Sequence, residues 1–193
     1  MSSDPTAAEI TRKAKSNLAF ALRCVPADRR RHLVSFYAFC RVIDDLADDL
    51  ELPLEEKKKG LAGWKKIFSN NTANVDLGLV DLQSDILKVR DLYEIPSDYL
   101  TNVIEGCQMD LQPQRFETWQ DLQEYTYRVA SSVGLVCLPL FAAEASRSHE
   151  YAVALGHALQ LTNILRDIGE DLTKGDRIYV PLHDLRRCDY TEN

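Results

Sequence analysis

The sequence has few residues that interrupt helices. Its 193 residues include 8 glycines and 7 prolines, and no long stretch alternates apolar and polar side chains as a half-buried strand would. Apolar side chains recur instead at helical spacing, for example at positions 33, 36, 37, 40, 43 and 47. With 193 residues, of which 45% are hydrophobic, the chain is long enough and apolar enough to bury a core. The pattern predicts one all-α domain over residues 1–193.

The sequence also lacks an excess of basic residues. It has 23 Lys and Arg against 30 Asp and Glu, which gives a formal net charge of −7. A protein that neutralises nucleic-acid phosphates needs a local surplus of positive charge. We therefore expect no nucleic-acid partner.

Long apolar runs and paired cysteines are missing as well. The longest apolar stretches are too short to span a bilayer, and MSSDPTAAEITRKAK at the N-terminus lacks the apolar centre of a signal peptide. The five cysteines are odd in number and show no CxxC spacing. These absences predict reduced thiols in a cytoplasmic protein.

The expected helices follow from apolar spacing and from turn residues. A loop is expected at SNNTAN, residues 69–74, and a capping box of Thr118 and Asp121 is expected to start a long helix that carries Gly134 and Pro139. The other expected helices cover residues 6–24, 27–50, 54–69, 79–94, 97–111 and 148–172.

An acidic run, DDLADDLE at residues 44–51, follows the apolar part of the helix expected at 27–50. Asp44 and Asp48 fall on one helix face, where like charges destabilise the helix by a few tenths of a kcal/mol, roughly. Alone, such a run is typical of a solvated helix end. An EF-hand is excluded because the ligand spacing and the required glycine are missing.

The same arrangement recurs in NILRDIGEDLTKGDRIYVP, residues 163–181. Asn163, Asp167 and Asp171 lie at i, i+4 and i+8 and form a second stripe at the end of an apolar helix. If the two stripes face each other, four carboxylates share one cavity, and burying them without cations is prohibitive. Hard divalent cations solve this, and Mg²⁺ is the natural choice when a substrate supplies phosphate oxygens. Nearby arginines would then clamp a diphosphate.

Four stretches resemble the squalene/phytoene synthase family, the head-to-head (1′–1) prenyl-diphosphate condensing enzymes. They are FYAFCRVIDDLADD (36–49), EGCQMDL (105–111), EYTYRVASSVG (124–134) and ALQLTNILRDIGEDLTKGDRIYVPLHDL (158–185). The resemblance implies the all-α isoprenoid synthase fold, in which two aspartate-rich helices face each other across a central cavity.

The resemblance also assigns residues, position by position. It implies Mg²⁺ ligands, catalytic groups around the reacting centre, and side chains that hold the diphosphate or line the prenyl tail. The implied metal ligands are Asp44, Asp48, Asn163, Asp167 and Asp171; the catalytic set is Asp44, Asp48, Asp167, Asp171 and Tyr125; the substrate set is Tyr37, Arg41, Val129, Ala130, Val133, Gly134, Gln160, Arg166, Arg177 and Tyr179.

Several of these residues have plainer interpretations. Tyr37 and Tyr125 are equally suited to a core, and Arg41 and Arg166 are spaced to form ion pairs with residues four positions later. Gly134 suits close helix packing. A head-to-tail prenyltransferase or terpene cyclase would also use Mg²⁺, and DDLAD fits its DDxxD pattern, whereas the second motif resembles the head-to-head group. A non-catalytic homologue that acts as an assembly factor is the third alternative.

The resemblance implies two prenyl diphosphates as substrates, farnesyl or geranylgeranyl, and a cyclopropyl diphosphate on the way to squalene or phytoene, hence to carotenoids or hopanoids. No dinucleotide fingerprint supports an NADPH step. A hydrophobic product suggests peripheral membrane association. Family members are longer, so the helices that close the cavity are expected from a further segment or a second chain.

Overall fold

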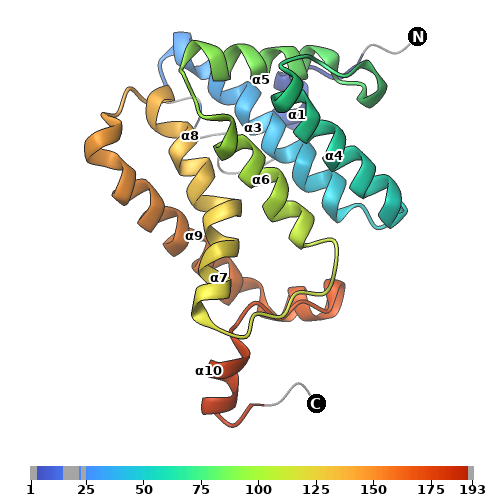
Figure 1. The fold of residues 1–193 in the computed structure, drawn as a ribbon, viewed down its shortest axis with the longest axis vertical. Helices are drawn as coiled ribbons and strands as arrows, with labels where there is room; N and C mark the ends of the chain where they lie inside the picture. Colours follow the sequence, from blue (N-terminus) through green and yellow to red (C-terminus); the bar gives the residue numbers. More distant parts are fainter. Residues whose placement is uncertain (1–3, 15–21, 23–24, 191–193) are drawn as a thin grey trace.

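Figure 1 shows a computed structural model of the chain, which describes residues 4–14, 22 and 25–190. Within these ranges the structure is helical, with one isolated parallel bridge between Arg115 and Ile178 and no named strand. The all-α prediction is thereby confirmed. The elements are α1 (Ala7–Lys13), α3 (Ala27–Asp48), α4 (Leu54–Asn70), η2 (Val75–Leu77), α5 (Val80–Leu92), α6 (Ser97–Met109), α7 (Trp119–Thr126), η3 (Tyr127–Ser131), α8 (Ser132–Leu140), α9 (Ala145–Gly175) and α10 (Leu182–Arg187).

The first helix begins at a capping box that satisfies its free backbone N–H groups. Thr6 Oγ1 accepts a hydrogen bond from the Glu9 N–H at 3.3 Å, and the Glu9 carboxylate accepts one from the Thr6 N–H at 2.8 Å. The expected helix over 6–24 therefore starts as predicted. Its course over residues 15–21, 23 and 24 lies outside the described residues.

The main core forms where α3 packs against α4, α5 and α6. Phe39 of α3 is fully buried and meets Trp64 and Phe68 of α4 edge-on, with ring centroids 5.5 and 5.7 Å apart. Ile43, one turn later, is also fully buried. Because this face of α3 is fixed in the core, the next turns present their aspartates at its edge.

The helix expected after Thr118 begins at the predicted capping box but is interrupted by a π-helical segment, η3. Glycines let two neighbouring helices approach it closely. A Cβ at Gly106 of α6 would collide with Val129, and one at Gly156 of α9 would lie 2.5 Å from the Ser131 Cα. The sequence predicted the helix here but not its widened turn.

The chain after α9 pairs with the segment that follows α6. Asp176 turns the chain with a left-handed backbone, φ 47°, and Ile178 and Leu182 then donate backbone hydrogen bonds to Gln114 and Phe116 at 3.0 and 2.8 Å. Arg115 forms an ion pair with Asp176 at 2.8 Å. The short α10, which was not predicted, follows and lies at the lower end of Figure 1 beyond the other helices.

The structure bears on two expectations, one about the cysteines and one about membrane-spanning helices. The four cysteines in the described part of the chain are free thiols: Cys40, Cys107, Cys137 and Cys188. Among the described residues, no helix combines the length and apolarity that crossing a bilayer requires.

Candidate functional site

The acidic end of α3 lies at the edge of the core, next to the buried side chains of Ile43 and Ala47. Asp44 and Asp48 expose 53% and 55% of their side chains. Nevertheless burial, followed by repulsion from Asp48, raises the pKa of Asp44. Asp44 is therefore partly desolvated although about half of its side chain is exposed. Arg41 holds Asp44 at 3.3 Å and also pairs with Asp45, so the expected i+4 ion pair forms beside the site.

The second acidic stripe lies along one side of α9, as the sequence predicted. Gln160, Asn163, Asp167 and Asp171 are all half-buried, and Asn163 Nδ2 donates to Gln160 Oε1 at 3.4 Å. Arg166 stands beside this stripe rather than in it. It donates to both oxygens of Asp167 at 2.7 and 2.6 Å, and this hydrogen bonding lowers the pKa of that carboxyl.

Arg177 connects the two acidic helix ends. Its Nη2 donates to Asp48 Oδ1 at 3.1 Å, and its backbone N–H donates to the Asp171 carbonyl, also at 3.1 Å. The pKa of Asp171 is raised by burial first, and Asp48 across the site is among the acidic groups that raise it further. The two stripes are therefore within electrostatic reach of each other, with a guanidinium between them.

Asp110, directly after α6, is a residue of this site that the sequence analysis did not assign. Its carboxylate accepts hydrogen bonds from the hydroxyls of Tyr125 at 2.9 Å and Tyr179 at 2.7 Å, and its carbonyl accepts one from Arg177 at 3.0 Å. The available signal was EGCQMDL, in which this aspartate and Glu105 are the two charged residues. Sequence spacing offered no partner for it, because all three partners come from distant segments.

Tyr125 belongs to a packed aromatic cluster with Phe116 and Tyr179. Its ring centroid lies 5.4 Å from that of Phe116 and 5.1 Å from that of Tyr179, and only 3% of the residue is exposed. Tyr179 is also buried. The hydroxyls of both tyrosines point to Asp110, so the cluster is polar on one side and apolar on the other.

The side chains expected along the prenyl tail are half-buried residues of η3 and α8, and Tyr37, expected near the diphosphate, is a half-buried residue of α3. Tyr37 lies close enough to Arg41 to influence its pKa. Gly134 packs closely on α9, because a Cβ there would lie 3.2 Å from the Ala152 carbonyl oxygen. The half-buried residues are Tyr37, Val129, Ala130, Val133 and Gly134.

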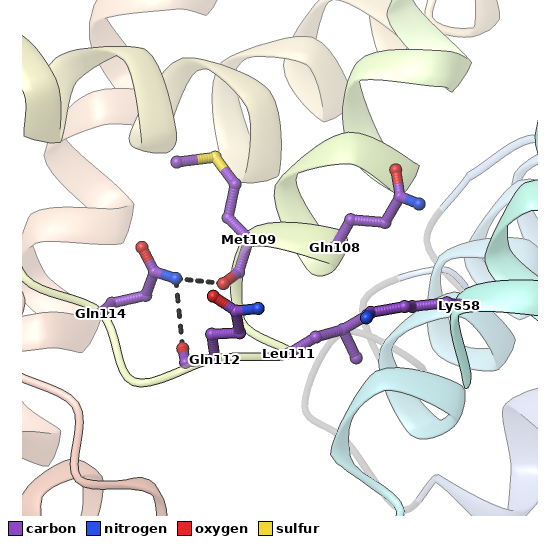
Figure 2. Close-up of a pocket in the computed structure, with 6 residues that line it drawn as sticks. All are labelled: Lys58, Gln108, Met109, Leu111, Gln112 and Gln114. Atoms are coloured by element: carbon purple, nitrogen blue, oxygen red, sulfur yellow. Dashed lines mark hydrogen bonds between the residues drawn. The ribbon is translucent and has the colours of Figure 1, made fainter. Parts of the chain in front are cut away.

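Two recesses lie near the site, one beside the end of α9 and one beside the turn after α6. One of about 450 Å³ lies between α9 and the chain leading to α10, with Asp171, Arg177 and Tyr179 in a lining that is otherwise mostly apolar. The other, of about 400 Å³, has three glutamines in its lining and lies between Lys58 of α4 and the turn after α6 (Figure 2). In Figure 2 the Gln114 amide reaches back to the backbone carbonyls of Met109 and Gln112, and these bonds fix the turn that contains Asp110.

In the described part of the chain, the acidic side chains of the site do not gather into one cluster. Within the described ranges, no three His, Cys, Asp or Glu side chains come together closely enough to hold a metal ion. Between the two stripes, Asp48 of α3 and Asp171 of α9 are close enough for one carboxylate to raise the pKa of the other.

Comparison with solved structures defines the class of protein first. The fold matches a dehydrosqualene synthase crystallised with a ligand, with a TM-score of 0.80 and 31% identity, over 96% of this chain and 63% of that one. It also matches squalene synthase HpnC from Alicyclobacillus acidocaldarius, with a TM-score of 0.78 and 27% identity, over 96% and 68% of the two chains. The chain therefore has the isoprenoid synthase fold.

The sequence comparisons then identify the family. The family model described as squalene/phytoene synthase matches residues 11–193, and the chain belongs to this family. It is 36% identical to a presqualene diphosphate synthase of Zymomonas mobilis, over 96% of this chain and 63% of that protein. It is 32% identical to a 15-cis-phytoene synthase of Synechococcus elongatus, over 95% and 62%. The chain thus spans rather less than two thirds of these relatives.

Proposed function

We propose that the protein catalyses the Mg²⁺-dependent head-to-head condensation of two prenyl diphosphates through a cyclopropyl diphosphate, towards squalene or phytoene. The observation that carries this proposal is the pair of acidic helix ends, on α3 and α9, joined by Arg177. Membership of the squalene/phytoene synthase family supports the same reaction class.

The donor groups fit magnesium that is shared with a substrate. Mg²⁺ is usually bound through one or two carboxylates together with substrate phosphate oxygens and water, rather than by a cage of protein ligands alone. Asp44 and Asp48 on one side, and Asn163, Asp167 and Asp171 on the other, offer such oxygens in small groups. The raised pKa values of Asp44 and Asp171 reflect unfavourable negative charge, which a cation would relieve.

Once bound, Mg²⁺ would act as a Lewis acid that draws charge from the diphosphate. Arg177 and Arg41 flank the acidic end of α3 and would neutralise the leaving diphosphate as its C–O bond breaks with the electron pair. The double bond of the second prenyl diphosphate would attack the allylic carbon, and loss of a proton would close the cyclopropane ring.

The half-buried apolar side chains of η3 and α8 would hold the hydrocarbon tails and exclude water from the allylic cation. Aromatic faces near the site, such as that of Tyr125, would attract the cation by about 0.5–2 kcal/mol. Substrates of 15 or 20 carbons both fit this chemistry. A hydrophobic product also favours loose association with a membrane surface.

The test is product analysis with farnesyl diphosphate or geranylgeranyl diphosphate as the sole substrate, with and without Mg²⁺ and NADPH. We expect Mg²⁺-dependent diphosphate release, with a cyclopropyl diphosphate or a hydrocarbon of twice the carbon number in the lipid extract. A product that forms only after isopentenyl diphosphate is added would instead indicate head-to-tail chemistry. The absence of diphosphate release under all conditions would indicate a non-catalytic homologue.

A further inference from the structure

Asp110 joins segments that are far apart in the sequence. Its two carboxylate oxygens are used separately: Oδ2 accepts from Tyr125 of α7, and Oδ1 accepts from Tyr179 beyond α9. Its backbone carbonyl accepts from Arg177, and the same Nη2 of Arg177 reaches Asp48 of α3. One residue at the end of α6 is thus linked directly or through one side chain to α3, α7 and the segment that follows α9.

Both ends of this arrangement are held firmly. On one side, the bonds from Gln114 to the Met109 and Gln112 carbonyls fix the turn around Asp110. On the other side, Tyr179 follows Arg177 by two residues, in the segment that pairs with residues 114–117. Anchoring the Tyr179 hydroxyl therefore also fixes the backbone from which the Arg177 side chain extends.

We propose that Asp110 is a positioning residue, which holds Tyr125, Tyr179 and Arg177 so that the guanidinium lies over the acidic end of α3. This inference rests on the proposed function, in which Arg177 neutralises the departing diphosphate. Asp110 itself need not touch the substrate. Its contribution is to keep the Arg177 guanidinium in place before negative charge develops on the departing diphosphate, because preorganised charge stabilises a transition state most effectively.

The surroundings of Asp110 agree with a group retained for geometry rather than for stability. Burial raises its pKa to about 6, although two tyrosine hydroxyls and Arg177 favour the charged form. The ionisable groups that face it are Tyr125 of α7, Arg177 and Tyr179 of the segment after α9, Asp48 of α3, and Cys107 of its own helix. The fold therefore keeps a carboxylate where a neutral group would be easier to bury.

The substitution Asp110→Asn separates a role of this carboxylate in positioning from a role in stability. The amide keeps the size of the side chain but offers one acceptor oxygen in place of two, so one tyrosine hydroxyl loses its acceptor. We expect kcat for Mg²⁺-dependent diphosphate release to fall by about 10-fold or more, with KM changed less than about 3-fold, because the loss falls mainly on the transition state. Urea unfolding at pH 7.5 should show the variant to be no less stable than the wild type.

Tyr179→Phe provides the matched second variant, since it removes one hydroxyl and keeps the ring in its cluster. If Asp110 acts through Tyr179, the double variant should be no slower than the slower single variant. If the two residues act independently, the fold-losses in kcat of the single variants should multiply. Wild-type turnover in Asp110→Asn would overturn the proposal, and so would a loss of activity that simply follows a loss of stability. If Asp110→Asn does not fold, wild-type kcat in Tyr179→Phe would overturn it.

Binding of inorganic pyrophosphate with Mg²⁺, measured by calorimetry, gives a readout that does not depend on turnover. We expect Asp110→Asn to weaken this binding by less than about 3-fold, because Arg177 remains present, while Arg177→Ala weakens it by about 10-fold or more. A wild-type protein that binds pyrophosphate but never releases diphosphate from prenyl substrates would contradict the proposed function. If the wild type is active but releases diphosphate no faster than Asp110→Asn does, the positioning role is contradicted and the proposed function is not.

Discussion

Burial raises the pKa of Asp110 to about 6, well above its ordinary value of 3.8. A raised pKa means that the folded protein binds this proton more tightly than the unfolded chain does. The contribution of Asp110 to the free energy of unfolding is therefore greatest below about pH 4 and is lost as the pH rises through about 6. At one pKa unit per 1.36 kcal/mol, the whole effect is at most about 3 kcal/mol.

The measurement is urea unfolding of the wild type and of Asp110→Asn between pH 4 and pH 8. Taking the difference between the two proteins cancels the other carboxylates, such as Glu105, whose pKa is lowered mainly by Lys65. We expect the wild type to lose stability relative to the variant as the pH rises from 4 to about 7, and then to level off. A difference that stays constant over this range would contradict the raised pKa.

At the end of α3, Asp44 and Asp49 carry the same charge in different surroundings. Asp44 faces Asp48 and Arg41, whereas Asp49 accepts backbone hydrogen bonds from Glu51 and Leu52 at 2.8 and 3.2 Å. Asp44→Asn should lower Mg²⁺-dependent diphosphate release by about 100-fold or more, while leaving the helix folded because it removes a repulsion. Asp49→Asn makes the same change of charge five residues later, at the end of the helix.

The comparison is made by a diphosphate-release assay together with circular dichroism. Asp49→Asn should remain within about 3-fold of the wild type, since its amide oxygen can still accept the turn hydrogen bonds. Equal effects of the two substitutions would show that only the net charge of the helix end matters.

Among the elements, the π segment η3 depends on two helices that approach it at glycines. A Cβ at Gly156 would lie 2.5 Å from Ser131 Cα and 2.6 Å from its backbone nitrogen, so the π segment itself would have to shift. A Cβ at Gly106 meets a side chain first, that of Val129. Gly169, in the same helix as Gly156, has nothing within 4 Å of its Cβ position.

These contacts predict an order of stability for three alanine variants. Gly156→Ala and Gly106→Ala should each destabilise by about 1–3 kcal/mol through overpacking, because the new Cβ meets the Ser131 backbone in one case and the stiff, branched side chain of Val129 in the other. Gly169→Ala should be neutral or stabilising by up to about 1 kcal/mol, because alanine favours the helix. Urea denaturation of the three variants provides the test, and a Gly156→Ala variant as stable as Gly169→Ala would contradict the close approach.

At the scale of the whole molecule, the site brings together helices from opposite ends of the chain. A ligand that binds the acidic ends of α3 and α9 together should stabilise the fold as one unit. We expect Mg²⁺ with inorganic pyrophosphate at about 100 times its Kd to add about 2.7 kcal/mol, which corresponds to a rise in Tm of about 5–10 °C.

Thermal unfolding with Mg²⁺ alone, pyrophosphate alone, both, and both with excess EDTA separates the contributions. The full shift should require both ligands and should vanish with EDTA or in Asp44→Asn. A shift of the same size with pyrophosphate alone would show that the arginines bind the anion without metal.

Much of the fold was determined by local sequence. Helical spacing placed most helices within a few residues of their observed ends, and the capping box at Thr118 marked the start of α7 correctly. The two acidic stripes were also predicted, because residues four apart share a helix face whatever surrounds the helix. The π segment was not predicted, since a widened turn depends on what packs against it.

The sequence alone thus determined most of the helices, the two acidic stripes and, through its motifs, the family. Only the tertiary structure decided that Arg177 joins the stripes and that Asp110 receives two tyrosine hydroxyls. The physical reason is that spacing along a helix governs contacts within about two turns. Contacts between residues 48, 110 and 177 depend instead on how buried faces bring distant helices together.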